Sequence, residues 1–156
     1  MNSTKVYLIG VNHLIQHTTH MTKIKKTSVQ KFTAYIHEQV TALQITTIAE
    51  EFSEEALRGA ESTARQLAKQ LNIEHRFCDP NTEERNKLKI DNIPKREQVW
   101  LERIQDLKNS KILFICGSLH LNTFKNLLEN SDIKTDILSN GWGSELDSDE
   151  HYGGNA

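Results

Sequence analysis

One sequence pattern occurs twice in this chain and constrains its fold more than any other feature. Residues 111–120, KILFICGSLH, form an apolar run that ends at Gly117 and is followed three residues later by His120. Residues 5–13, KVYLIGVNH, repeat that order with Gly10 and His13. A short apolar run bounded by glycine is typical of a buried strand that ends in a loop. The pattern therefore predicts two buried strands, each with a histidine just beyond its end.

Strand and helix patterns alternate along the rest of the chain. Strands are predicted over residues 5–10, 44–51, 74–78, 112–116 and 133–138, and helices over 27–43, 53–71, 92–107 and 122–129. Thr27 and Gln30 match a capping box at the start of the first helix. Strict alternation of this kind predicts the α/β class, with a mostly parallel sheet of about five strands and helices on both faces.

The length of the chain favours one domain. A chain of 156 residues can bury one sizeable core but is short for two. Residues 1–140 are predicted to form a single α/β domain. Residues 141–156 are rich in acidic residues and glycine, and we expect them to be mostly a mobile tail.

Composition narrows the expected partners and location. The formal net charge is -2 and there is no large basic excess, so no nucleic-acid partner is expected. No apolar run reaches membrane-spanning length, and the N-terminus lacks the features of a signal peptide, so we expect a cytoplasmic protein without a membrane partner. In a reducing compartment, Cys78 and Cys116 are expected to be small buried hydrophobic residues.

The predicted strand ends carry most of the chemistry in the sequence. Ligands of parallel α/β sheets bind outside the carboxyl ends of the strands. At those ends lie His13, the adjacent pair Glu50 and Glu51, then Asp79, and finally His120. We therefore expect these side chains to share one edge of the sheet.

Two of these histidines and one carboxylate make a candidate metal site. Neutral imidazole is a common ligand of zinc-like ions, and a carboxylate completes a two-histidine set that leaves positions open for water. His13, His120 and Glu51 are the predicted ligands of a divalent ion, manganese, cobalt or zinc. A bound ion of this kind lowers the pKa of its water toward neutrality.

Three further residues are candidates for catalysis. Glu50 or Asp79 could take the proton of the attacking water. Arg96 lies one helical turn before Trp100 on the inward stripe of a predicted helix, where a buried guanidinium needs an anionic partner. It could hold a substrate carboxylate or stabilise an oxyanion, or it could pair structurally with one of the acidic residues.

Structural explanations compete with each of these assignments. Paired glutamates can be solvated at a strand end, and Asp79 with Pro80 can simply open a turn. His17 and His20 are predicted to be loop residues, and no role is predicted for His37, His75 and His151. Ser118 does not lie in the G-x-S-x-G pattern of serine hydrolases, so it is not expected to be a nucleophile.

These motifs resemble a known superfamily. It includes the plasmid TraB proteins, the Tiki metalloproteases and, more distantly, the erythromycin esterases and ChaN-type haem-binding proteins. The resemblance covers Gly10/His13, Glu51 followed by Phe52, Arg96, and Gly117/His120, and spans about residues 6–124. It implies a metal-dependent hydrolytic centre, with protease activity in some relatives. This sequence is shorter than those of the relatives, and we expect it to have neither their membrane anchors nor their inserted helices.

Three functional hypotheses follow. The first is a metal-dependent hydrolase, peptidase-like or esterase-like, that acts on a small-molecule or peptide substrate. The second is a module of the same fold that binds or senses a small anion, a nucleotide or haem without turnover. The third is a purely interaction-based role in which the histidines are structural. Binding that depends on His13 and His120 separates the first two from the third.

Overall fold

A five-stranded parallel sheet forms the centre of the molecule. The computed structural model describes residues 3–148. The strands are β1 (Lys5–Val11), β2 (Thr47–Glu50), β3 (Glu74–Phe77), β4 (Lys111–Gly117) and β5 (Lys134–Trp142). Their spatial order is β3-β2-β4-β1-β5, and every pairing is parallel. The predicted α/β class with its parallel sheet is confirmed.

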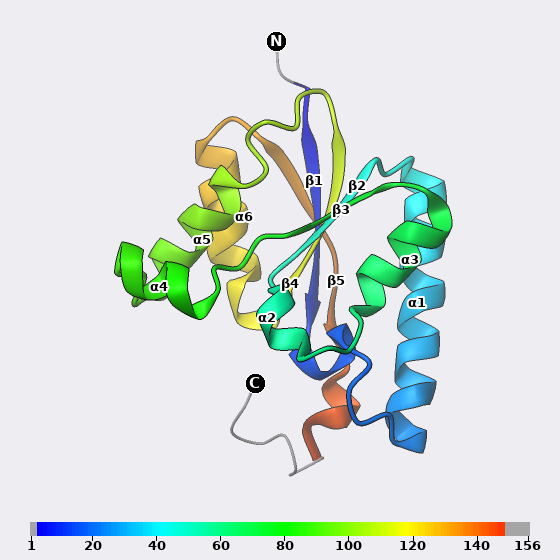
Figure 1. Cartoon of the computed structure of the whole chain (residues 1–156). Coiled ribbons are helices and arrows are strands. Elements are labelled where there is room, and N and C mark those ends of the chain that lie inside the picture. Colours follow the sequence, from blue (N-terminus) through cyan, green and yellow to red (C-terminus); the bar gives the residue numbers. More distant parts are fainter. Residues whose placement is uncertain (1–2, 149–156) are drawn as a thin grey trace.

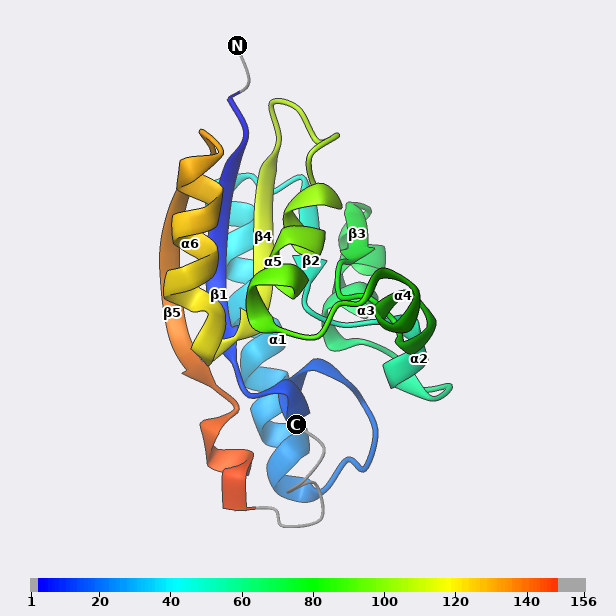
Figure 2. The ribbon, with the colours of Figure 1, turned by 90° about the vertical axis from the view of Figure 1, so that its left-hand side faces the viewer.

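Helices cover both faces of this sheet. The helices are α1 (Lys23–Leu43), α2 (Glu54–Leu57), α3 (Thr63–Leu71), α4 (Thr82–Leu88), α5 (Ile93–Glu102) and α6 (Leu121–Asn130), with short 3-10 turns η1 (His13–Gln16), η2 (Ser118–His120) and η3 (Ser144–Ser148). Helices α1 and α3 lie on one side of the sheet, and α5 and α6 lie on the other (Figure 1). In the view turned by 90°, α5 and α6 are in front of the sheet and α1 is behind it (Figure 2).

The central strand β4 shows why both faces are apolar. Leu113 and Ile115 belong to the core under α1 and α3, whereas Ile112, Phe114 and Cys116 belong to the core under α5 and α6. Successive side chains of a strand point to opposite faces, so a strand covered on both sides must be apolar throughout. The apolar run over residues 112–116 is uninterrupted because both faces of β4 are buried.

Strand pairing brings the two glycine-histidine segments together. β1 and β4 are neighbours, and Gly10 and Val11 of β1 pair with Cys116 and Gly117 of β4. The two strands therefore end side by side at the same edge of the sheet, the lower edge in Figure 1.

The first two helical regions differ from the prediction. Thr22, not Thr27, caps α1, because its side chain accepts a hydrogen bond from the Lys25 N–H at 3.1 Å. The single helix predicted over residues 53–71 is two helices, because Arg58 and Gly59 adopt φ angles of 49° and 85°. Glycine adopts positive φ at little cost, so the chain turns there and starts α3 afresh.

Two later segments also differ in their bounds. The stretch 81–91, which lies between a predicted strand and a predicted helix, contains a further helix, α4, which starts at a capping box formed by Asn81 and Glu84. The last strand extends beyond residue 138 to Trp142, and Leu146 of η3 is buried in the core. The predicted domain boundary at residue 140 therefore falls inside β5. Residues 149–156 of the predicted tail lie outside the described residues. Within residues 3–148, no helix combines the length and the apolar composition that crossing a membrane requires.

Candidate functional site

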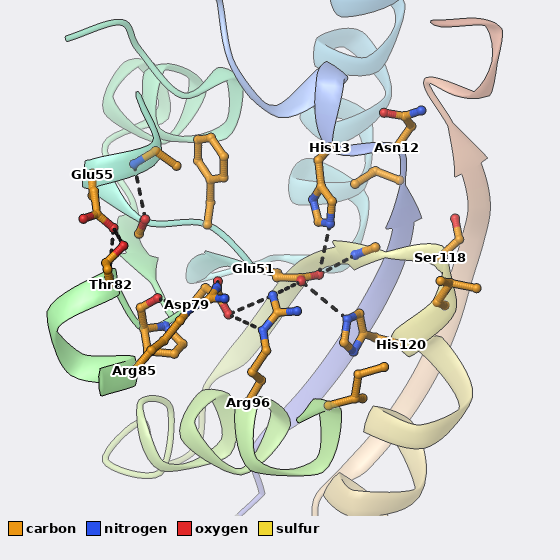
Figure 3. Close-up of a pocket in the computed structure, with 18 of the residues that line it drawn as sticks. Asn12, His13, Glu51, Glu55, Asp79, Thr82, Arg85, Arg96, Ser118 and His120 are labelled. Carbon is orange, nitrogen blue, oxygen red and sulfur yellow. Dashed lines mark hydrogen bonds and ion pairs between the residues drawn. The ribbon is translucent and has the colours of Figure 1, made fainter. Parts of the chain in front are cut away.

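A pocket of about 930 Å³ opens at the carboxyl ends of the strands. Its walls come from the segments that follow β1, β2, β3 and β4, together with the start of α5 (Figure 3). Five of the six predicted site residues line this pocket: His13, Glu51, Asp79, Arg96 and His120. They are separated in sequence by up to 107 residues, from 13 to 120, and meet because parallel strands end at one edge.

Glu51 is the carboxylate at the centre of this cluster. Its side chain is only 3% exposed. Oε1 accepts a hydrogen bond of 2.8 Å from the backbone N–H of Gly117, and Oε2 accepts one from Nη2 of Arg96. Nε2 of His13 lies 3.6 Å from Oε1, and Nε2 of His120 lies 3.5 Å from Oε2. Both histidines of the repeated motif therefore face the same buried carboxylate.

His120 is oriented by a second buried carboxylate. Its Nδ1 lies 2.8 Å from Oε2 of Glu97, which also accepts a hydrogen bond of 2.6 Å from Oγ1 of Thr123. An ionised carboxylate can only accept, so Nδ1 carries the proton in this bond. The Nε2 of a neutral His120 then presents its lone pair to the pocket. The ring also packs against Trp100, with 4.7 Å between the centroids.

His13 is oriented by an amide instead. Its Nδ1 lies 2.5 Å from Oε1 of Gln16, three residues on in the same 3-10 turn. Asn12 caps that turn by accepting a hydrogen bond from the Leu14 N–H at 2.9 Å. The cap fixes the direction in which the chain leaves β1, and with it the direction of the His13 ring.

Gly117 allows these groups to approach the backbone. A Cβ at this position would lie 3.0 Å from Nε2 of His13 and 3.3 Å from Oε1 of Glu51. Such contacts are tighter than side chains normally make, and the Gly117 N–H also holds Glu51 directly. The glycine therefore provides space for the imidazole and a donor for the carboxylate.

Asp79 and Arg96 form a second charged pair in the pocket. Oδ1 of Asp79 accepts hydrogen bonds from Nε and Nη2 of Arg96, at 3.2 and 3.1 Å, and from Nε1 of Trp100 at 3.0 Å. Its Oδ2 accepts one of 2.5 Å from Arg85. Burial lowers the pKa of Arg96, but the carboxylates of Asp79 and Glu51 outweigh this and raise it overall. Arg96 therefore stays a cation, and both oxygens of Asp79 have donors.

Glu50 is the predicted site residue that does not reach the pocket. It precedes Glu51 directly, and adjacent side chains in an extended segment point to opposite sides. Glu50 is fully buried on the side of α3, where it binds Gln16, Ser62 and His75. A direct role for Glu50 in proton transfer within the pocket is incompatible with this position.

Glu97 and Gln16, which hold the two imidazoles, are not among the residues predicted from the sequence. Glu97 lies three residues before Trp100, so it occupies the buried stripe of its helix, and a charge on such a stripe is a recognisable signal. Gln16 lies three residues after His13, the spacing of one 3-10 turn. That turn was not apparent from the sequence pattern.

Two imidazole nitrogens and one carboxylate are a donor set that suits zinc, manganese or cobalt. Across residues 3–148, no three His, Cys, Asp or Glu side chains are already arranged around a common point as metal ligands would be. Both oxygens of Glu51 are instead engaged by Gly117 and Arg96. The chemistry of the donors fits a metal ion, whereas their present positions require the side chains to shift on binding.

The two cysteines have no nucleophilic character. Burial raises the pKa of Cys78 to about 12 and that of Cys116 well above its usual value. Both side chains are free thiols inside the core. They remain protonated at neutral pH and act as apolar packing groups.

Comparisons with models of protein families, with curated proteins and with solved structures give no match to this chain.

Proposed function

We propose that this chain is a metal-dependent hydrolase with a centre of two histidines and one carboxylate. His13, His120 and Glu51 hold a divalent ion, manganese, cobalt or zinc. The observation that carries the proposal is the position of the two Nε2 atoms, 3.6 and 3.5 Å from the two oxygens of one buried carboxylate. The resemblance of the two G-x-x-H motifs to the TraB and Tiki superfamily points in the same direction.

The charge distribution supports a cation at this point. Nδ1 of each imidazole faces an acceptor, Gln16 for His13 and Glu97 for His120, so the neutral rings turn lone pairs toward Glu51. Lone pairs and carboxylate oxygens repel one another unless a cation, a proton or a metal ion, lies between them. A divalent ion satisfies both rings and the carboxylate at once.

The bound ion and the residues around it would have separate roles in hydrolysis. A bound ion would supply a water of lowered pKa as the nucleophile. Arg96 lines the pocket beside Glu51 and can stabilise negative charge that develops on a substrate carbonyl oxygen. Asp79 fixes the Arg96 guanidinium through two hydrogen bonds, so we assign it to holding Arg96 rather than to accepting a proton.

The proposal includes a substrate class and a location. The pocket combines polar groups with apolar residues, including Leu119, Ile93 and Phe52, and so suits a small ester or amide or a short peptide. We place the protein in the cytoplasm, where the two buried thiols stay reduced.

Metal titration combined with a hydrolysis assay tests the proposal. The metal-stripped protein is titrated calorimetrically with manganese, cobalt and zinc, and then assayed against esters and fluorogenic peptides. We expect one strong site and metal-dependent turnover, both lost in the double variant His13→Ala/His120→Ala. The matched control is His37→Ala, because His37 is exposed on α1 and far in sequence from the motif.

Two results would contradict the proposal. One is a wild-type protein that binds none of the three metals. The other is metal binding that the double variant retains while the fold, followed by circular dichroism, is intact.

A second candidate function rests on Arg85 and Arg96. Both guanidinium groups line the pocket and meet at Asp79, so together they could bind a small anion without turnover. In that case a phosphate or carboxylate ligand would raise the melting temperature while the metal-loaded protein cleaves no substrate in the panel.

A further inference from the structure

The proposed mechanism leaves one fully buried carboxylate, Glu50, unused. Its exposed fraction is 0%. It accepts hydrogen bonds from Nε2 of Gln16 at 2.9 Å, Oγ of Ser62 at 2.5 Å and Nε2 of His75 at 2.6 Å. A buried charge is costly unless donors surround it, and here three elements supply them. Of the three donors, Gln16 also contacts a pocket histidine.

Glu50 determines which way the Gln16 amide points. A carboxylate accepts hydrogen bonds and does not donate, so the Gln16 NH2 group must face it. The same NH2 group lies 3.4 Å from the backbone carbonyl oxygen of Glu51, a second acceptor. The Gln16 carbonyl oxygen is therefore directed the other way, toward His13.

The direction of that amide decides the position of the proton on His13. Oε1 of Gln16 can only accept, so Nδ1 of His13, 2.5 Å away, must donate. The neutral ring then has its lone pair on Nε2, the atom 3.6 Å from Glu51 in the pocket. The proton of an imidazole is placed by the hydrogen bond that its other nitrogen makes.

We propose that Glu50 and Gln16 are positioning residues that hold the His13 proton on Nδ1 and keep Nε2 available in the pocket. Ser62 and His75 also donate to Glu50, but we assign them no part in orienting the Gln16 amide. A carboxylate that points away from the pocket thus controls a pocket nitrogen through one intervening amide. The consequence for metal binding rests on the proposed function, but the position of the proton can be measured without it.

The proposal is tested by nitrogen-15 NMR of the histidine side chains at a pH where His13 is neutral. The wild-type protein should show the proton on Nδ1 of His13. Gln16→Met keeps the size of the side chain and removes the acceptor. Glu50→Gln removes the group that orients the amide. In both variants we expect the proton to populate Nε2, and metal affinity to fall about 10- to 100-fold, the usual effect of losing an outer partner of a ligand.

Ser62→Ala is the matched control. It removes a donor to Glu50 and the N-terminal cap of α3, which lowers stability, whereas none of the hydrogen bonds of Ser62 within residues 3–148 goes to Gln16 or His13. The His13 proton should stay on Nδ1. The proposal is overturned if His13 keeps that proton in both Gln16→Met and Glu50→Gln, or if Ser62→Ala shifts it equally. If either Gln16→Met or Glu50→Gln fails to fold, the position of the His13 proton in the other variant tests the proposal. A wild-type protein that binds no metal would refute the proposed function. The position of the His13 proton could still be measured by NMR in that case, so the two proposals fail separately.

Discussion

The two G-x-x-H segments share a sequence pattern but are built differently. Each places a histidine beyond a central strand, with Nε2 directed at Glu51. His120 donates to a buried carboxylate, Glu97, whereas His13 donates to a neutral amide, Gln16. A carboxylate partner raises the basicity of an imidazole more than an amide does. The pair is therefore chemically unequal, and in the proposed metal site His120 would be the stronger ligand.

The glycines of the two segments also serve different ends. A Cβ on Gly117 would meet Nε2 of His13 at 3.0 Å, so this glycine shapes the site. A Cβ on Gly10 would meet Cδ1 of Leu121 at 2.7 Å and the side chain of Asn140. Gly10 thus makes room for packing between β1, α6 and β5. The glycine of the motif therefore lies at the proposed site in one segment and makes room for packing in the other.

Loss of His120 should have the largest effect. His120→Ala removes the proposed ligand that a carboxylate orients, and it leaves Glu97 as a buried charge without its imidazole. We expect metal affinity to fall by more than the roughly 100-fold that loss of an outer partner can cost, and turnover to disappear. His13→Ala should lower metal affinity by a smaller factor. Calorimetric titration of both variants measures the difference in metal affinity. Equal losses, or a larger loss in His13→Ala, would show that the two histidines do not differ in this way.

Neutralising the outer partner of His120 should come next. Glu97→Gln leaves the ring in place but removes the charge that polarises it. We expect a loss in metal affinity near the upper end of the roughly 10- to 100-fold range, and a smaller loss for Gln16→Met. Dissociation constants for cobalt in the two variants give the ratio. If Glu97→Gln binds cobalt like the wild type, the charge of Glu97 has no role in the site.

The two glycines separate binding from stability. Gly117→Ala should lower metal affinity about tenfold, or about 1.4 kcal/mol, because the His13 ring must shift. Gly10→Ala should lower the free energy of unfolding by about 1 to 3 kcal/mol through overpacking, with metal affinity preserved. Urea denaturation measures the free energy of unfolding of each variant, and metal titration measures its affinity. An affinity loss confined to Gly10→Ala would contradict it.

The two segments also differ in His17, which follows His13 by four residues, whereas Phe124 stands at the corresponding place after His120. Burial, aided by the nearby Lys25 charge, lowers the pKa of His17 from 6.5 to about 4. The unfolded chain therefore binds this proton more readily, so the stabilisation is full above about pH 6.5 and is lost as the pH falls toward 4.

Between pH 7 and pH 5 this difference amounts to about 1 to 2 kcal/mol. His17→Gln should flatten the fall in stability over that range, measured by denaturant melts at each pH. His37→Gln, at an exposed site, should leave the fall unchanged. A pH dependence that is the same in all three proteins would refute the assignment to His17.

The parts of the fold that could be predicted are those that depend on apolar periodicity. The run from 112 to 116 predicted a strand covered on both faces, and its side chains alternate between two helix layers. The prediction that His13, Glu51 and His120 approach one another followed from the rule that parallel strands end at one edge. Apolar patterning indicates which faces of an element are buried, and this was sufficient to predict the strands and the edge of the sheet that their ends share.

Partners of polar groups could not be predicted in the same way. Glu50 and Glu51 are adjacent residues of the same type, but Glu51 lines the pocket and Glu50 is buried away from it. Their environments differ because side chains alternate between the two sides of an extended segment. The link from Gln16 to Glu50 joins residues 34 apart, and nothing local in the sequence indicates it. Helix α4, in contrast, had a readable signal, since Asn81 and Glu84 have the spacing of a capping box. Local chemistry can be read from the sequence, whereas contacts between elements depend on how the elements pack.

X-ray absorption spectroscopy of the zinc-loaded protein decides whether both histidines bind the same ion. It measures the ligands of the bound ion. We predict two imidazole nitrogens at about 2.0 to 2.1 Å from the zinc ion, with oxygen completing the shell. We further expect this signal to be lost in His13→Ala/His120→Ala. An ion without imidazole ligands, or a spectrum that the double variant reproduces, would contradict the claim that the two motifs share one metal centre.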